Sequence, residues 1–192
     1  TKVRSATLRP ANSPPLAWIK AEALARSDGA SVAAWPDSSG NGHEGLQGTT
    51  GRRPVFHTNV QNGNPGVRFD PANSSSLSLA TLGTALGSSA HSWLFLTKPT
   101  DLSQYPIIVT YPVDAAWSYI IEYNAGDGQF YWAAGHDYTI FASNFVAGPH
   151  LISLVDTGGV GHLYKAGSDI TPGAIVPLCA LPGDIQLGRY TE

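Results

Sequence analysis

The sequence contains no methionine and only one cysteine, and charged residues make up just 13% of its 192 positions. A single cysteine excludes a disulfide within the chain, and the apolar neighbours of Cys179 favour a buried small residue over a reactive thiol. The net charge of -3, with basic residues scattered along the chain, provides no positive surface for nucleic acid or an anionic membrane. No apolar run approaches the length of a bilayer span, so we expect neither a nucleic-acid partner nor membrane insertion.

The length bounds the domain organisation. A chain of 192 residues suits one domain with its own core, although length alone also permits two small ones. Residues 1–15 are polar and end in two prolines, so we interpret them as a leader or connector in which residues 3–8 could add an edge strand. Residues 16–192 form the expected domain. Because the chain starts with threonine and lacks methionine, we expect it to be a processed or excised part of a longer protein.

The distribution of glycine and proline favours an all-β fold. The 21 glycines and 14 prolines are spread along the whole chain, which is typical of short strands joined by turns. Loops rich in glycine and aspartate at 124–128 and 156–160 each separate two apolar segments and predict hairpins. Strands are expected at residues 67–69, 75–79, 92–97, 107–111, 119–123, 129–133, 151–155, 161–165 and 185–188. This spacing is typical of a sandwich or jelly roll, whereas residues 16–26 allow either a strand or a helix.

A dense run of turn residues begins at Trp35. Its glycine, asparagine, aspartate and serine residues favour positive φ angles and side-chain-to-backbone hydrogen bonds, so we expect an ordered loop. Asp37 and Ser39 are expected to hold its turns. Gly40 and Gly42 are expected to let the backbone pass close beneath Trp35. The same stretch matches GxGxxG, but a dinucleotide site requires a preceding strand and a following helix, and neither is evident.

The loop and its flanking segments follow the order of a known family. The segments are Trp18-Ile-Lys-Ala, Trp35-x-Asp37-x-Ser39-Gly40-x-Gly42, Arg53-Pro54, Asn64-Pro-Gly-Val67-x-Phe69-Asp70 and Leu77-x-Leu79, then 149–158, 162–167 and 185–188. Together they resemble the laminin-G-like, concanavalin A-like lectin–glucanase jelly roll of bacterial surface and bacteriophage proteins. The resemblance implies an all-β, two-sheet antiparallel β-sandwich, with a concave face that binds ligands in lectin-like members. It also implies that residues 16–21 form a strand.

The end of the chain departs from this family pattern. The strand at 185–188 is commonly followed by another strand in the family, but here only a few residues follow it. An uncovered sheet edge promotes unwanted association. We therefore expect residues 3–8, further chain, or a neighbouring virion or surface-protein subunit to cover that edge.

The acidic residues do not form a pattern expected of a glycosidase. Glycoside hydrolysis requires two carboxylates about 5–10 Å apart, and Glu122 is alone on its strand while the other carboxylates lie mostly in turns. No GxSxG motif indicates a serine nucleophile. No two histidines have the spacing of a zinc site. We expect no enzyme activity and no cofactor, with calcium as the one alternative, for which Asp37 and Asp127 are the candidate ligands.

Aromatic residues concentrate between positions 117 and 138. Sugars stack their apolar faces on aromatic rings while polar groups bind their hydroxyls. The predicted ligand-binding residues are Trp117, Tyr119, Glu122, Trp132, His136 and Tyr138. Strand alternation places Tyr119 and Glu122 on opposite faces, so part of this cluster is expected to be ordinary core.

These observations favour a non-catalytic carbohydrate or cell-surface binding module, displayed outside the cell or on a phage particle. Two alternatives remain at this stage. One is a structural decoration or assembly module of a virion or surface layer, and the other is a glycan-cleaving enzyme of concanavalin A-like fold.

Overall fold

The computed structural model describes residues 14–87, 90–100, 107–110, 119–124, 129–134, 137–141, 145–156, 161–171 and 185–188. Within these ranges the regular structure is almost entirely β. The helical elements there are α1 (Leu82–Leu86) and three short 3-10 turns: η1 (Ala21–Ala23), η2 (Thr50–Arg52) and η3 (Pro71–Asn73). Cys179 and the possible strand at 3–8 lie outside the described residues.

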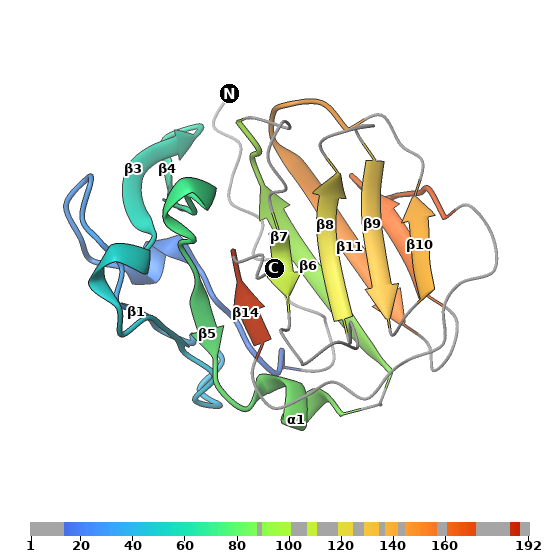
Figure 1. Ribbon diagram of the computed structural model, residues 1–192, viewed down its shortest axis with the longest axis horizontal. Helices are drawn as coiled ribbons and strands as arrows, with labels where there is room; N and C mark the ends of the chain where they lie inside the picture. Colours follow the sequence, from blue (N-terminus) through green and yellow to red (C-terminus); the bar gives the residue numbers. More distant parts are fainter. Residues whose placement is uncertain are drawn as a thin grey trace.

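Two antiparallel sheets form the body of the molecule, with the front sheet nearer the viewer in Figure 1. In spatial order the front sheet comprises β1 (Ala34–Trp35), β2 (Gly45–Leu46), β5 (Leu77–Leu79), β14 (Ile185–Leu187), β7 (Ile107–Thr110), β8 (Tyr119–Asn124), β9 (Gln129–Ala134) and β10 (Asp137–Phe141). The back sheet comprises β13 (Ser168–Asp169), β12 (Gly161–Lys165), β11 (His150–Asp156) and β6 (His91–Thr97). A separate hairpin pairs β3 (Val55–Gln61) with β4 (Asn64–Arg68).

The main core lies between the two sheets. Ile121 of β8 and Phe130 of β9 are fully buried and belong to the same apolar cluster as Ile152, Leu154 and Leu163 of the back sheet. Figure 1 shows β6 and β11 crossing behind the strands of the front sheet. Every second residue of β11 is buried, as expected for a strand with one face in a core. The predicted all-β, antiparallel sandwich is confirmed, as are the two predicted hairpins, β8–β9 and β11–β12.

A second, smaller core lies where hairpin β3–β4 meets the loop that begins at Trp35, which we call the opening loop. Its buried members are Ala21, Leu24, Val32, Phe56 and Leu77. Trp35 packs against this cluster from the start of the loop. The loop that carries the family-like motif is therefore fixed to the body of the domain by apolar packing at its first residue.

The strand implied at residues 16–21 is wrong. Ile19 makes one isolated bridge with Asp37, and the chain then enters the 3-10 turn η1. The Asp37 side chain explains this difference, because its carboxylate accepts a hydrogen bond from the backbone N–H of Trp18, 2.8 Å away. A side chain thus occupies a donor that a continuing β-ladder would use.

The strand predicted near the end of the sequence is present as β14. β14 occupies the middle of the front sheet and pairs with β5 on one side and β7 on the other. Both of its edges are therefore covered by the chain itself. Residues 3–8 lie outside the described residues, so the edge strand expected from them, or from a neighbouring subunit, stays a prediction.

Candidate functional site

The opening loop is organised around one carboxylate. Oδ1 of Asp37 accepts hydrogen bonds from the backbone N–H groups of Trp18 and Ser39, both at 2.8 Å. Oδ2 accepts from the Ser39 hydroxyl at 2.6 Å and from the His43 backbone N–H at 3.1 Å. The Ser39 hydroxyl oxygen in turn accepts from the N–H of Asn41 at 3.2 Å. Burial opposes ionisation of Asp37, but these bonds outweigh it and hold the pKa of the carboxyl below its usual range.

The donors around Asp37 do not suit a calcium ion. A carboxylate offers about four lone-pair positions, and four protein donors already point at this one. A cation at the same oxygens would face the positive ends of three N–H groups. Asp37 is therefore a structural residue of the loop and does not fit the role of calcium ligand, while Asp127 lies outside the described residues.

The remaining loop residues serve the same structural purpose. The indole N–H of Trp35 donates to the carbonyl of Lys20 at 2.8 Å, which ties the start of the loop to the preceding segment. Gly40 and Gly42 have φ angles of +89° and +80°, a region that favours glycine. A Cβ at either position would meet no atom within 4 Å, so the close approach beneath Trp35 expected of them is wrong. Nothing in this loop gathers a chemically reactive group, so it supports the fold rather than a site.

The predicted aromatic site falls mainly on β8, β9 and β10. Trp117 and His136 lie outside the described residues. Tyr119 and Glu122 lie on β8, Trp132 lies on β9 and Tyr138 lies on β10. The structure thus brings these four positions onto three neighbouring strands.

Strand register divides these four positions between the two faces of the front sheet. Trp132 lies directly opposite the buried Ile121, and Tyr119 is two residues from Ile121 along β8, so both positions share the core face. Glu122 is paired with Tyr131 on the opposite, outer face. Tyr138 belongs to that outer face as well, because it pairs with Ala133, the neighbour of Trp132.

The outer face of the back sheet carries a second group of polar and aromatic side chains. Ser153 of β11 pairs with Leu94 of β6 on one side and with Tyr164 of β12 on the other. Tyr164 in turn pairs with Asp169 of β13. One row of side chains therefore crosses all four strands, on the side opposite the buried Leu163.

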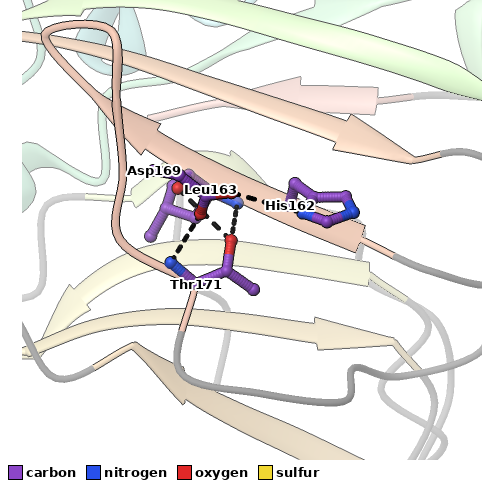
Figure 2. A network of polar contacts seen from close by, with 4 residues as sticks. All are labelled: His162, Leu163, Asp169 and Thr171. Carbon is purple, nitrogen blue, oxygen red and sulfur yellow. Dashed lines mark hydrogen bonds and ion pairs between the residues drawn. The ribbon is translucent and has the colours of Figure 1, made fainter.

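Figure 2 shows the polar network at the end of this row. Nδ1 of His162 lies 3.6 Å from Oδ2 of Asp169, and the backbone N–H of Thr171 donates to Oδ1 of Asp169 at 2.9 Å. The Thr171 hydroxyl oxygen accepts from the N–H of Leu163 at 2.9 Å. The hydroxyl and amide of Thr171, with His162 nearby, hold the pKa of the Asp169 carboxyl below its usual range.

The sequence alone did not single out this network. It predicted residues 161–165 only as a strand, and the carboxylate comes from beyond the turn at Ala166 and Gly167. The alternation of His162, Leu163 and Tyr164 could have indicated that two aromatic rings share one face. The pairing of β12 with β13 was needed to add Asp169.

No other binding chemistry is evident in the part of the chain that the structure describes. None of its groups of histidine, cysteine and carboxylate side chains is arranged to hold a metal ion. No helix there is long and apolar enough to cross a bilayer.

Comparison with known proteins yields similarity in fold only. No protein-family model matches the chain, and no curated protein matches its sequence. Among solved structures, domain 4 of AbnA, a GH43 extracellular arabinanase from Geobacillus stearothermophilus in complex with arabinotriose, aligns over 84% of both chains with a TM-score of 0.56 and 13% identity.

Two sialidase structures also share the fold. Trypanosoma rangeli sialidase in complex with sialic acid aligns with a TM-score of 0.53 and 8% identity. A mutant of that enzyme displaying trans-sialidase activity aligns with a TM-score of 0.54 and 10% identity. Each alignment covers 86% of this chain but only 27% of the sialidase. At these identities the likeness shows a shared β-sandwich architecture.

Proposed function

We propose that this domain is a non-catalytic carbohydrate-binding module of laminin-G-like type, displayed outside the cell or on a virion. The observation that carries the proposal is the structural match with arabinanase domain 4. The alignment covers 84% of both chains, and the arabinanase domain is in complex with arabinotriose in that structure. The match therefore extends over a whole domain of similar size. Because fold alone does not determine function, the positions of individual residues on the sheet must identify the binding surface.

The outer face of β8, β9 and β10 is the proposed sugar-binding surface. Register brings Glu122 and Tyr131 into a pair on this face, and Tyr138 lies one row away on β10. Tyrosine offers an apolar ring for the C–H face of a sugar and a hydroxyl for its polar edge. A carboxylate accepts hydrogen bonds from sugar hydroxyls. Trp132 and Tyr119 are assigned to packing because their positions share the face of Ile121.

The distribution of carboxylates supports a non-catalytic role. Glu122 and Asp137 are the acidic residues on the strands of the front sheet. Asp137 pairs with Ala134, which lies two residues from Trp132 on the core face, so the positions of Asp137 and Glu122 belong to opposite faces. A glycosidase needs two carboxylates that flank the scissile bond within one site, about 5–10 Å apart, and positions on opposite faces of a sheet do not provide this arrangement.

Retention on an oligosaccharide array tests the proposal. We expect the unmodified domain to be retained, and Tyr138→Ala or Glu122→Gln to reduce retention without changing the melting temperature. Leu46→Ala is the matched control, because Leu46 is 44% exposed on the same outer face but belongs to the distant strand β2. Equal retention of all four proteins would contradict the proposed surface.

Sugar release tests the non-catalytic part of the proposal separately. We expect no increase in reducing ends when the domain is incubated with polysaccharides. Release that Glu122→Gln abolishes would instead identify a glycan-cleaving enzyme.

A further inference from the structure

The outer face of the back sheet combines apolar and polar side chains in a single row. Leu94, Ser153, Tyr164 and Asp169 follow one another across β6, β11, β12 and β13. Neighbouring strands lie about 4.8 Å apart, so the row extends over roughly 14 Å. Leu94 is 44% exposed at one end, and the side chain of Asp169 is 48% exposed at the other. We call this row, together with His162, the back-face platform.

The two rings of the platform lie side by side. The ring centroids of His162 and Tyr164 are 6.3 Å apart, and their planes differ by 31°. Nδ1 of His162 is buried beside Asp169, whereas 36% of the whole side chain is exposed, so the exposed area belongs to the other atoms of the imidazole. The pair therefore places two neighbouring aromatic rings on this face, with the buried Nδ1 of His162 on the protein side, 3.6 Å from Oδ2 of Asp169.

The carboxylate at the end of the platform is held in a fixed orientation. Thr171 donates its backbone N–H to Oδ1 of Asp169, while Oδ2 faces His162. The Thr171 hydroxyl is itself bonded to the backbone of Leu163, so the network connects β12 to the segment that follows β13. An aspartate is ionised at neutral pH, and the hydrogen bonds from Thr171 lower the pKa of Asp169 further in the same direction. It presents a charged acceptor next to the rings of His162 and Tyr164.

We propose that the back-face platform is a second carbohydrate-binding site, on the opposite side of the sandwich from Glu122 and Tyr138, and that it binds neutral oligosaccharides. This inference rests on the proposed function of the domain. The rings of Tyr164 and His162 stack against the C–H face of one sugar unit. Asp169 and Ser153 bind hydroxyl groups on either side of that unit, and Leu94 contacts the next unit.

The charge of the platform favours neutral over acidic sugars. The ionised Asp169 repels a second carboxylate. Lys165, the next residue of β12 after Tyr164, does not offset this charge on the platform, because its ammonium lies 4.3 Å from the ring centroid of the buried Phe145. A sialylated or uronic acid ligand would therefore bring two negative charges together.

The composition of the row favours a sugar over a protein partner. The buried centre of a protein interface is depleted in charged residues. Within the row, Ser153 and Asp169 alternate with Leu94 and Tyr164, and the exposed Leu96 with its partner Leu151 extends the apolar surface only beside Leu94, at one end of the row. Sugars, in contrast, present alternating apolar faces and hydroxyl edges to the surface that binds them.

Titration of the isotope-labelled domain, followed by NMR, tests the proposal. The probes are arabinotriose, cellotriose and, as the acidic ligand, 3′-sialyllactose. We expect at least one neutral trisaccharide to shift the amide resonances of Leu163 and Thr171, which report on the network, and the acidic probe to leave them unchanged. Tyr164→Ala should weaken this interaction about tenfold, which corresponds to the loss of one well-packed ring contact.

Two further variants separate the possible explanations. Asp169→Asn keeps the shape of the side chain but removes its charge, and should weaken neutral trisaccharides about fivefold at this face. Leu96→Ala is the matched control on the same face, because Leu96 is 74% exposed and lies outside the row. Its affinity should equal that of the unmodified domain.

The outcomes distinguish this inference from the proposed function. If neutral sugars shift amides of β8, β9 and β10 but leave Leu163 and Thr171 unchanged, the back-face site is wrong and the proposed function stands. If none of these sugars shifts any amide, both are wrong. If Tyr164→Ala instead lowers self-association in sedimentation without affecting sugar binding, the platform is a protein interface and the inference is overturned.

Discussion

Replacement of Asp37 by alanine should cost this domain a large part of its stability, although the side chain is only partly buried. The carboxylate accepts four hydrogen bonds, from Trp18, Ser39 and His43. Two of these connect segments that are 19 and 6 residues apart in sequence. Loss of the carboxylate therefore releases the segment before η1 from the opening loop.

The expected magnitude follows from the number and kind of these bonds. A hydrogen bond to a charged acceptor contributes about 1.5–3 kcal/mol. The site is partly exposed and the freed N–H groups can recover water, so we expect about 3 kcal/mol for Asp37→Ala rather than the sum of four bonds. For a chain of this length that loss corresponds to a decrease in melting temperature of roughly 6–12 °C.

Chemical denaturation and differential scanning calorimetry measure this effect, with Asp70→Ala as the matched control. The Asp70 carboxylate accepts two hydrogen bonds, and both come from residues only two and three positions away in sequence. Asp70 caps the N-terminus of η3 in this way. Loss of such a cap costs about 1 kcal/mol. If the two substitutions cost the same, the connection between distant segments contributes nothing and the reasoning is refuted.

The pH dependence of Asp37→Asn provides a second test of the same carboxylate. The pKa of Asp37 is lowered in the folded state, so its contribution is fully present above its unfolded pKa of about 3.9. That contribution is lost as pH falls through the lowered folded value. The difference in unfolding free energy between the unmodified domain and Asp37→Asn should therefore be constant above about pH 5 and shrink below pH 4. A difference that stays constant down to pH 2 would contradict the assigned role.

Four further substitutions test the packing and the register. Gly188→Ala should destabilise the domain by at least ~2 kcal/mol, because a Cβ there would overlap the Phe69 ring and the residue has a φ of +85°; urea denaturation would show this. Ile121→Ala should cost about 3–4 kcal/mol because Ile121 is fully buried, whereas Ile120→Ala, on the outer face by register, should cost less than about 1 kcal/mol. Trp132→Ala should lower the melting temperature more than the affinity for any retained sugar, and a selective loss of affinity would reverse the assigned faces.

Local patterns predicted the elements that depend on neighbouring residues. The β8–β9 and β11–β12 hairpins were expected from alternating apolar residues on both sides of a glycine-containing loop, and the structure contains both. The division of β8 between Tyr119 and Glu122 also follows from alternation alone. Trp132 could be assigned a face only after its pairing with Ile121 was known, because register is a property of two strands.

Features that depend on distant residues escaped sequence analysis. The segment at 16–21 has the composition of a strand, but the carboxylate of Asp37 binds the N–H of Trp18 and only one bridge forms. β14 is separated from its partners β5 and β7 by long stretches of chain, so its central place in the sheet has no local signature. β10 was not predicted at all, although it contains Tyr138.

The positions of the two proposed surfaces limit how they can act together. Glu122 and Tyr138 lie on the outer face of the front sheet, whereas Tyr164 lies on the outer face of the back sheet, and the buried layer that includes Ile121 and Leu163 separates them. Sheets pack about 10 Å apart, and each surface faces away from the other. A trisaccharide can therefore occupy one surface only, and the two sites cannot reinforce each other on one short ligand. On a polysaccharide-coated surface, the same geometry allows one domain to hold two separate chains. Avidity then depends on the density of the chains rather than on the length of each one.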